Sequence, residues 1–399
     1  MTAYTKTLLR DSSLVDDVIN RRDECDDREI VMGYIKLGVA AFLVPELTGP
    51  HKVGTTWMEL IDHSRLDPFA TTPNHAVSQY RHFKLAPQFP KKFVTFWNDM
   101  VNQTGIVEDT VTLRSYEGAP LARPDLPLIL LSPGFGSSRL FYSDYAEELA
   151  SYGYNIVTID HTYDAPIVEY PDGRTIISNL SAIIVAGGVI DPAIFDPLLW
   201  PRVADMIFVL NSLSNSSIRA QIPNLRDRWL RTESVGAIGG SFGGATAYQV
   251  MANDTRFVAG GNFDGELFGT SVSEDQDRPF LFLASLTHNY TLDPSWREAW
   301  PHLKGFKRIF GVANTEHPSF LDWVVLRQIL GDTFPSYVSA EIGTINGTRM
   351  LAIERAFTGA FFDRFLKGQI GELLDRKGLD AWPDITWIKE PPASGLYPS

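Results

Sequence analysis

Cysteine is almost missing from this chain, which has one, Cys25, among 399 residues. A single thiol cannot close an intrachain disulfide, and its isolation is typical of a protein from a reducing compartment. Metal-binding patterns are missing as well, because the eight histidines show no His-x-x-x-His spacing and there are no paired cysteines. We therefore expect no metal ion and no cofactor.

Positive charge and long hydrophobic runs are also scarce. The net charge is −13 and no cluster of lysines and arginines offsets it, so nucleic acid is not an expected partner. Met1–Glu29 has no apolar core and is expected to be a mobile or helical extension. The apolar run Val31–Pro45 is too short to span a bilayer, and three interpretations remain: a buried segment, an interfacial anchor or a displaced signal sequence.

Glycosylation sequons are more frequent than chance. Asn-x-Ser/Thr occurs six times, where about two occurrences are expected at random. The excess favours a secreted protein, with a cytoplasmic location as the alternative that Cys25 supports. The sequons begin at Asn102, Asn179, Asn215, Asn253, Asn289 and Asn346.

The composition, 44% hydrophobic and 12% aromatic, is sufficient for one large core. Apolar runs with strand length alternate with helical stretches over residues 127–368, without a linker or an internal repeat, which indicates an α/β fold with a mostly parallel sheet. We assign 1–45 to an N-terminal extension, 46–390 to a catalytic domain and 391–399 to a tail. The predicted strands are Leu128–Ser132, Ile156–Asp160, Val235–Ile238, Phe257–Gly260, Phe280–Ala284 and Ile309–Ala313.

Helical periodicity predicts the layers that cover this sheet. Helices are expected from Phe141 to Gly153, over Val203–Leu213, and from Ile353 to Lys367. Nearer the N-terminus, Lys52–Asp62 is expected to be an edge strand and Leu66–Pro90 a loop.

Gly239-Gly240-Ser241-Phe242-Gly243-Gly244-Ala245 follows a predicted strand and opens a predicted helix. This pattern is typical of a nucleophile elbow, a tight turn in which small neighbours allow a strained serine to expose its hydroxyl. Ser241 is therefore the predicted nucleophile of a serine hydrolase.

A nucleophilic serine needs a histidine base and an acid that orients it, and on this fold they follow in the order Ser, Asp/Glu, His. Three histidines lie downstream: His288, His302 and His317. His317 follows a strand and lies in a polar loop, and Asp264 follows the strand next to the elbow, so we predict this pair. Asp293 and Asp322 are the alternatives for the acid.

The reaction also needs two N–H donors for the oxygen that becomes negative. Phe242 N–H follows the nucleophile, and Phe135 N–H lies in Pro133-Gly134-Phe135-Gly136 after the first predicted strand of the sheet. We predict both as oxyanion donors, although this loop alone is also compatible with a plain glycine-rich turn.

Several of these motifs resemble the platelet-activating-factor acetylhydrolase family, most of all its fungal members. They are Gly-x-Ser-Phe-Gly-Gly-Ala-Thr at 239–246, Phe263-Asp264, and His317-Pro-Ser-Phe-Leu-Asp, together with Thr48–Thr55, Ser132-Pro-Gly-Phe-Gly and Asp160-His-Thr-Tyr-Asp-Ala. The resemblance extends over most of residues 47–385. It implies an α/β-hydrolase fold with helices on both faces of the sheet, and the same roles for Ser241, Asp264, His317, Phe135 and Phe242.

The resemblance further implies a calcium-independent, lipase-like esterase that removes short sn-2 acyl groups from phospholipids. One residue departs from the family, which usually has histidine at the position of Gly240. Residues 176–200 are expected to form either a lid or an ordinary pair of buried helices. His161 and Asp164 either line the acyl pocket or have a structural role.

We therefore predict hydrolysis of a small-molecule ester or phospholipid through an acyl-enzyme, with transient contact to a lipid surface. A broader carboxylesterase, lipase or polyester hydrolase would share the same catalytic residues. An acyltransferase and a catalytically silent binding protein are the alternatives from other functional classes.

Overall fold

A computed structural model of the chain describes residues 42–66, 75–83, 88–100, 111–178 and 192–389. Residues Ala40–Ser399 form one compact unit. The predicted extension Met1–Glu29 and the tail 391–399 lie outside the described residues. Of the apolar run Val31–Pro45, the described end contains strand β1 (Phe42–Leu43), which pairs with β4 (Val111–Thr112), and Val44 after it is buried.

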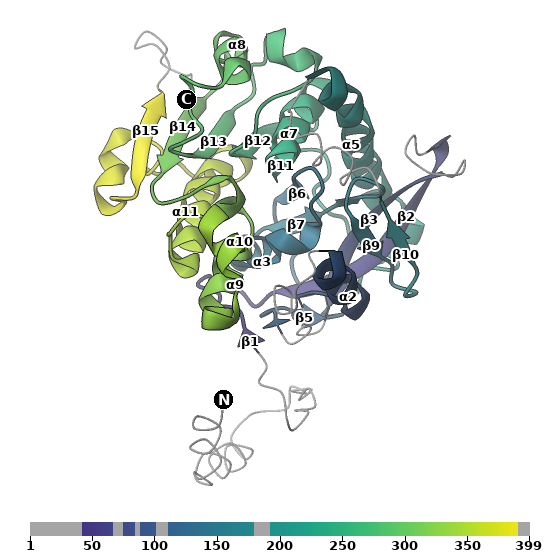
Figure 1. Cartoon of the computed structure of the whole chain (residues 1–399). Coiled ribbons are helices and arrows are strands. Elements are labelled where there is room, and N and C mark those ends of the chain that lie inside the picture. The colour runs from purple at the N-terminus through teal and green to yellow at the C-terminus, as the bar shows by residue number, and fades with distance from the viewer. Residues whose placement is uncertain (1–41, 67–74, 84–87, 101–110, 179–191, 390–399) are drawn as a thin grey trace, which may run out of the picture. The chain divides into compact units, whose positions relative to one another are not determined.

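A seven-stranded sheet forms the centre of the described molecule, in the order β15-β14-β13-β12-β11-β6-β7 (Figure 1). All neighbours are parallel except β15, which runs antiparallel to β14. All six predicted strands are confirmed, the second one as two consecutive short strands, β7 and β8 (Asp160–His161). The strands of the central sheet are β6 Leu128–Ser132, β7 Asn155–Thr158, β11 Val235–Gly240, β12 Phe257–Phe263, β13 Phe280–Ser285, β14 Lys307–Val312 and β15 Ile385–Lys389.

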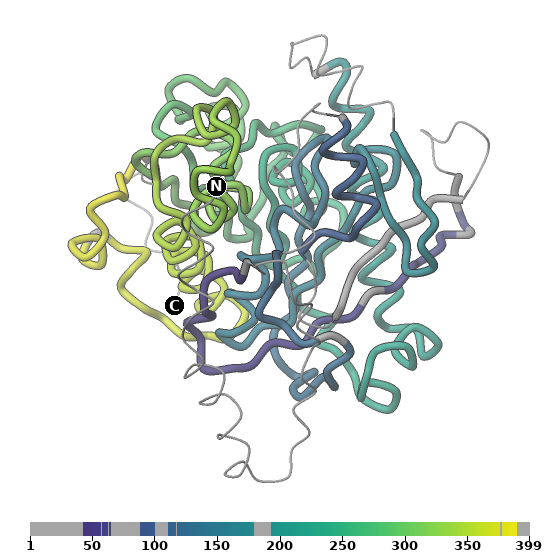
Figure 2. Tube along the Cα trace, turned by 60° about the horizontal axis from the view of Figure 1, so that its bottom comes forward, coloured from purple at the N-terminus to yellow at the C-terminus, as the bar shows by residue number. Residues whose placement is uncertain are grey.

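A second sheet, in the order β5-β2-β3-β8, adjoins the central sheet where β8 follows β7. It contains β5 (Tyr116–Glu117), β2 (Gly54–Leu66) and β3 (His75–Phe83). The β2–β3 pair and the C-terminal β15 lie on opposite sides of the described molecule (Figures 1 and 2). A small antiparallel pair, β9 (Ile167–Glu169) with β10 (Thr175–Ile177), follows β8.

The second sheet bears on two expectations near the N-terminus. Lys52–Asp62 is a strand as predicted; it pairs with β5 only at Gly54 and Thr55, and from Thr56 onward its one described partner is β3, so most of its length is an edge. The loop predicted over Leu66–Pro90 is wrong for β3, which pairs antiparallel with β2 from Thr55–Phe83 to Asp62–Ala76. β3 is defined by hydrogen bonds to a partner strand. Its own sequence is mostly polar and has no apolar run, so a strand could not be predicted from it.

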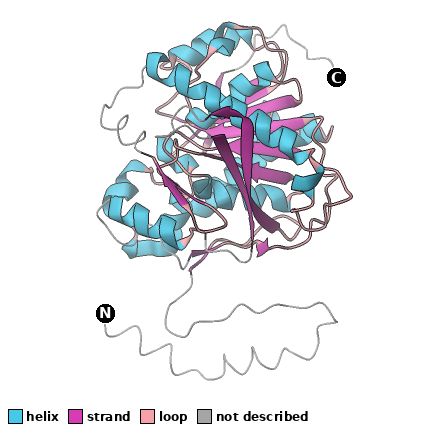
Figure 3. Ribbon diagram, turned by 90° about the vertical axis from the view of Figure 1, so that its right-hand side faces the viewer, coloured by secondary structure: helices cyan, strands magenta, loops and turns pink. Residues whose placement is uncertain are grey.

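Helices cover both faces of the central sheet, and Figure 3 shows the strands enclosed between them. Alternation along the strands sends Ile129 and Leu131 of β6 to one core and Leu128 and Leu130 to the other. The first core contains α3 (Ser143–Ser151), α9 (Trp323–Leu330) and α11 (Gly347–Leu366); the second contains α5 (Pro192–Leu213), α7 (Phe242–Asn253) and α8 (Pro294–His302). The other described α-helices are α2 (Lys91–Met100), α6 (Ser216–Arg219) and α10 (Ser336–Glu341).

The fold class predicted from the sequence, an α/β sheet with helices on both faces, is thus confirmed. Among the described residues, none of the helices has both the length and the apolar character that crossing a membrane requires.

Residues 192–200, predicted as part of a lid or of a helix pair, form the first half of α5. This 22-residue helix includes the predicted helix Val203–Leu213 and begins 11 residues before it. This part of α5 packs on the second core through the buried residues Phe195, Leu198 and Leu199. It is therefore a helix that covers the sheet. At the other end of the predicted segment, Ile176 and Ile177 belong to β10, and residues 179–191 lie outside the described residues.

Candidate active site

The carboxyl ends of five parallel strands bring the predicted catalytic segments to one edge of the sheet. The strands are β6, β11, β12, β13 and β14, and they are followed by Phe135, Ser241, Asp264, His288 and His317, respectively. In open α/β sheets, ligands bind at this edge because the loops after neighbouring strands meet there. The candidate active site is built on these five ends.

Ser241 lies between β11 and α7 with φ 54° and ψ −126°, a conformation that residues other than glycine rarely adopt. Its backbone N–H donates to Phe263 O at 2.7 Å. A Cβ on Gly239 would collide with the backbone of Gly243, and a Cβ on Gly243 would collide with Ser132 O. The elbow therefore requires glycine on both sides of the serine, which is the physical reason for the motif.

Asp264 comes directly after β12 and also has positive φ, at 54°. Its neighbour Gly265 lies so close to Ser241 O that no Cβ would fit between them, which places Asp264 beside the nucleophile strand. The carboxylate is 1% exposed, and its Oδ1 accepts the backbone N–H of Ser285 at 2.7 Å and the Ser285 hydroxyl at 3.0 Å. The other oxygen is free to bond a histidine.

His317 provides that histidine: its Nδ1 lies 2.8 Å from Asp264 Oδ2. It begins a short 3-10 turn, His317–Phe320, which is fixed by hydrogen bonds between Glu316 and Ser319. The imidazole is about half exposed, at 52%. An Asp carboxylate on Nδ1 holds the proton there and leaves Nε2 available as a base, the arrangement that a serine hydrolase needs.

The loop after β6 lies against the elbow. A Cβ on Gly134 would stand 3.3 Å from Ser241 Cβ and 3.5 Å from Gly240 O. Phe135 follows in this loop, and Phe242 is the first residue of α7, where backbone N–H groups have no partner within the helix. Both predicted oxyanion donors therefore lie on segments that touch at the serine.

The alternative candidates have structural partners of their own. Asp293 caps α8 by accepting from Ser295 N and Trp296 N. Asp322 is buried before α9 and accepts from Gln88 Nε2 at 2.9 Å, and its burial raises its pKa to about 7. The third histidine, His302, is bonded to Asp275 at the far end of α8. None of these three contacts His317.

Comparison with known proteins identifies the family of this chain. The sequence model of the family described as platelet-activating factor acetylhydrolase, isoform II, matches residues 87–172 and 213–361, more than half of the chain. The chain belongs to this family. It is a carboxylic ester hydrolase.

Two proteins illustrate the range of its relatives. A probable 1-alkyl-2-acetylglycerophosphocholine esterase of Arthroderma benhamiae is 27% identical over 88% of this chain and 94% of its own length. A platelet-activating factor acetylhydrolase of Cavia porcellus is 26% identical over 49% of this chain and 48% of its own.

A solved structure, a ferulic acid esterase from Streptomyces cinnamoneus, superposes with a TM-score of 0.72 and 30% identity. It covers 88% of this chain and 100% of its own, so the two share the fold throughout that structure.

Gly240, the residue that departs from the family resemblance, has a structural explanation. A Cβ at this position would collide with the hydroxyl of Tyr142, a residue that is 2% exposed. The Tyr142 hydroxyl accepts a hydrogen bond from Gly134 N at 3.2 Å, and burial raises the pKa of this phenol, which keeps it neutral. In this family member, Tyr142 occupies the space that a side chain at position 240 would need, and it also bonds to the loop after β6.

His288 is a partner of Asp264 that the sequence prediction missed, since it was considered only as a base. Its Nε2 lies 2.6 Å from Asp293 Oδ2, its Nδ1 lies 3.0 Å from Asp264 O, and its ring stacks on Trp296. Burial alone would lower the pKa of His288, but its hydrogen bonds to the two carboxylates outweigh burial and raise the pKa to about 10. His288 is thus a cation at neutral pH beside the predicted triad acid.

The two histidines together keep Asp264 ionised. Burial opposes its charge, but the hydrogen bonds from His288 and His317, together with their electrostatic attraction for the carboxylate, lower its pKa. In the described part of the chain, Asp264, His288 and His317 are the one group whose ligand atoms lie within 4.8 Å of one another, as a metal site would require. Their bonds to each other, to Ser285 and to Asp293 account for this spacing without a metal, so the absence of a metal remains the prediction.

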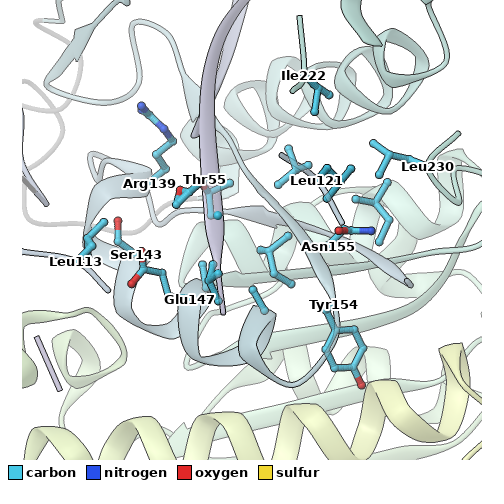
Figure 4. A pocket seen from close by; sticks show the side chains of 18 of the residues that line it. Thr55, Leu113, Leu121, Arg139, Ser143, Glu147, Tyr154, Asn155, Ile222 and Leu230 are labelled. Atoms are coloured by element: carbon cyan, nitrogen blue, oxygen red, sulfur yellow. The ribbon is translucent and has the colours of Figure 1, made fainter. Parts of the chain in front are cut away.

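A cavity of about 140 Å³ lies elsewhere, between α3, β7 and the start of β2 (Figure 4). Its wall is mostly apolar, with Arg139 and Glu147 among the polar residues, and it contains none of the predicted catalytic residues. His161 and Asp164, which we considered for the acyl pocket, are buried beneath the loop after β6. His161 bonds to Asp205 and Ser132, which indicates the structural role.

Proposed function

We propose that this chain hydrolyses short sn-2 acyl esters of phospholipids through an acyl-enzyme on Ser241. His317 Nε2 takes the serine proton as the hydroxyl attacks the ester carbonyl, and the N–H groups of Phe135 and Phe242 hold the resulting oxyanion. His317 then protonates the leaving alcohol, the lysophospholipid. Water, activated by the same histidine, releases the acid. The hydrogen bond between His317 and Asp264 carries this proposal, because it fixes the tautomer that the base needs.

The preference for a short acyl group is supported by a cluster of phenylalanines at the two oxyanion donors. The Phe195 ring centroid lies 5.4 Å from that of Phe135, 5.2 Å from that of Phe242 and 5.3 Å from that of Phe268. Rings at these distances are in contact, and they belong to the residue after the serine, to the oxyanion loop and to the segments packed on them. A long acyl chain would have to displace them, whereas an acetyl group would not.

A series of phospholipids that differ only in their sn-2 acyl group tests this proposal. With acetyl, butyryl, hexanoyl and palmitoyl esters presented as monomers, we expect kcat/KM to be highest for acetyl. The palmitoyl ester should be slower by at least about a hundredfold, because at about 1–3 kcal/mol each, the first few methylenes that do not fit already cost that much. Equal rates along the series would contradict the short-acyl pocket, while leaving an esterase.

A second candidate function is favoured by the solved relative, which is named as a ferulic acid esterase. Methyl ferulate in the same assay separates the two, since a higher kcat/KM for the ferulate than for the acetyl phospholipid would favour a hydroxycinnamoyl esterase. The classes outside hydrolysis are tested in parallel. Acyl transfer to added alcohols would indicate an acyltransferase, and a lack of labelling by a fluorophosphonate would indicate a silent binding protein.

Transient contact with a lipid surface is the second part of the proposal. Large apolar side chains are exposed on segments next to the site: Ile194 and Trp200 on the first half of α5, and Leu286 and Leu292 after β13. Trp200→Ser combined with Leu292→Ser should reduce sedimentation with phosphatidylcholine vesicles several-fold, because less apolar area enters the interface. Ile370→Ser, another exposed apolar site, is the control and should sediment like the wild type. Equal loss in both variants would oppose a specific contact face.

A secreted location, expected from the sequons, remains a proposal. Asn215, Asn253 and Asn346 are exposed, and Asn289 is half-buried, so all four of these described sequons have some access to solvent. If the chain passes through a eukaryotic secretory pathway, an N-glycosidase should lower its mass by the mass of one or more glycans. An unchanged mass after such expression would oppose glycosylation.

A further inference from the structure

The loop that carries the Phe135 donor is held from beneath by a buried arginine of α5. Arg202 is 1% exposed, and its guanidinium donates to Pro133 O at 2.7 Å and to Gly134 O at 2.9 Å. These are two consecutive carbonyls immediately before Phe135. A buried arginine that donates two hydrogen bonds to one loop fixes the orientation of that loop.

Two hydrogen bonds to Gly134 O, from Arg202 and from the backbone N–H of Ser137 at 3.2 Å, determine where the Phe135 N–H points. Gly134 O and Phe135 N–H belong to the same planar trans peptide, in which the carbonyl and the N–H point in opposite directions. Because Arg202 holds the carbonyl oxygen on its own side, the N–H is directed away from α5. The opposite end of the Gly134 residue is fixed by Tyr142, whose hydroxyl accepts the Gly134 N–H.

Asp164 holds the arginine in a two-point ion pair. Arg202 Nε lies 2.7 Å from Asp164 Oδ2, and Nη2 lies 2.7 Å from Asp164 Oδ1. The same Oδ1 accepts the N–H of Gly136 at 3.0 Å. The ion pair therefore grips the loop on both sides of Phe135, by carbonyls before it and by an N–H after it.

Arg202 also contacts the residue of the second donor. Its guanidinium carbon lies 4.9 Å from the ring centroid of Phe242. The two donor residues follow different strands, β6 and β11, and one side chain touches both segments. This combination distinguishes Arg202 from an arginine that only fills space in a core.

We propose that Arg202, fixed by Asp164, is a positioning residue that orients the Phe135 peptide toward the oxyanion. It touches neither the serine nor the ester in this role, and acts through the peptide it holds. The inference rests on the proposed function, because it assumes acyl transfer at Ser241. It predicts that loss of Arg202 weakens binding of the tetrahedral species more than binding of the ground-state ester.

Arg308, on the central sheet, is a matched control. It is 8% exposed on β14, donates to Leu374 O and Lys307 O, pairs with Asp375, and lies over the ring of Trp387. Its partners thus parallel those of Arg202, but it lies near the amino end of its strand, away from the loops of the site. Arg308→Met should lower stability and leave catalysis within about threefold of the wild type.

The experiment compares Arg202→Met, Arg202→Lys and Arg308→Met with a short-chain aryl ester and an alkyl boronic acid, which forms a tetrahedral adduct with a serine. Arg202→Met should lower kcat about a hundredfold with KM within about threefold, and should raise the inhibition constant of the boronic acid by a similar factor. Arg202→Lys should recover only part of the lost kcat and of the boronic acid inhibition, because one ammonium group cannot make the several fixed hydrogen bonds of a planar guanidinium. Arg202→Met with kcat and boronate inhibition like those of Arg308→Met would overturn the proposal.

Asp164→Asn provides a second test if Arg202→Met does not fold, as judged by thermal unfolding. The amide keeps the shape of the carboxylate but removes its charge, which weakens the hydrogen bonds to Arg202. We therefore expect kcat to fall about tenfold and boronic acid inhibition to weaken in parallel. Unchanged values would also overturn the proposal. Retained turnover in Ser241→Ala would instead reject the proposed function itself, so the two failures are distinguishable.

Discussion

Substitution of Ser241 by alanine is expected to lower kcat by about five to six orders of magnitude, because no other group in the described site is placed to form the acyl-enzyme. Labelling by a fluorophosphonate should be lost together with turnover. The fold should persist, since the residue contributes its backbone N–H to Phe263 O and this bond does not need the side chain.

Two further variants make the Ser241 experiment decisive. Ser273→Ala changes an exposed serine at the end of a 3-10 turn, whose described hydroxyl bond goes to Thr270 O, and should keep the full rate. Ser241→Gly should be as inactive as the alanine variant, but should unfold at a higher temperature, because glycine removes the cost of positive φ, about 1 kcal/mol or more. An alanine variant that keeps more than about a tenth of the wild-type rate would reject Ser241 as the nucleophile.

The second large effect is expected for Asp264→Asn, with a loss of about four orders of magnitude in kcat. The amide retains the shape of the carboxylate, but it can donate to His317 Nδ1 and so favour the tautomer in which Nε2 carries the proton. That imidazole cannot accept the serine proton. Asp293→Asn is the matched control, because it changes the other carboxylate on His288 and leaves the bond between Asp264 and His317.

The control also tests the alternative assignment of the acid. If Asp293→Asn lost more activity than Asp264→Asn, the assigned roles of the two carboxylates would be reversed. We expect less than about a tenfold loss, since Asp293 bonds His288 and the start of α8 and does not reach His317.

The same pair of variants should change the pH dependence of stability. His288 has a folded pKa of about 10, above its ordinary value of 6.5, so its ion pairs stabilise the fold fully below about pH 6.5, and this contribution is lost as the pH rises through about 10. Asp264 has a lowered pKa, so its contribution is present above its ordinary pKa and is lost in acid. Asp264→Asn should weaken both dependences, which thermal unfolding from about pH 2 to about pH 11 would measure.

Local patterns made the centre of the site predictable. The elbow is encoded by glycines next to Ser241, and Asp264 and His317 each follow an apolar strand by a few residues, so a reader of the sequence could place all three at one sheet edge. The Asp264–His317 bond agrees with that placement. These features are visible because strand, turn and helix occur within one short window.

Long-range pairings explain what the sequence did not reveal. Strand β3 depends on hydrogen bonds to β2. The pKa of His288 is raised by two carboxylates that lie on separate segments of the chain. Arg202 is the one cation of α5, in the middle of the helix, and its relation to Gly134 spans 68 positions. A cation in a mostly apolar helix could have indicated a specific partner, but not which one.

The antiparallel strand β15 links the end of the described chain to catalysis. It is the neighbour of β14, whose carboxyl end leads to His317, and the backbone N–H of Ala313 donates to Asp384 O just before β15 begins. Proteolysis upstream of Ile385 would remove the edge strand of the sheet. The segment that leads to His317 would then lose the strand that pairs with it. The esterase should therefore tolerate a C-terminal fusion far better than a C-terminal deletion that reaches this strand.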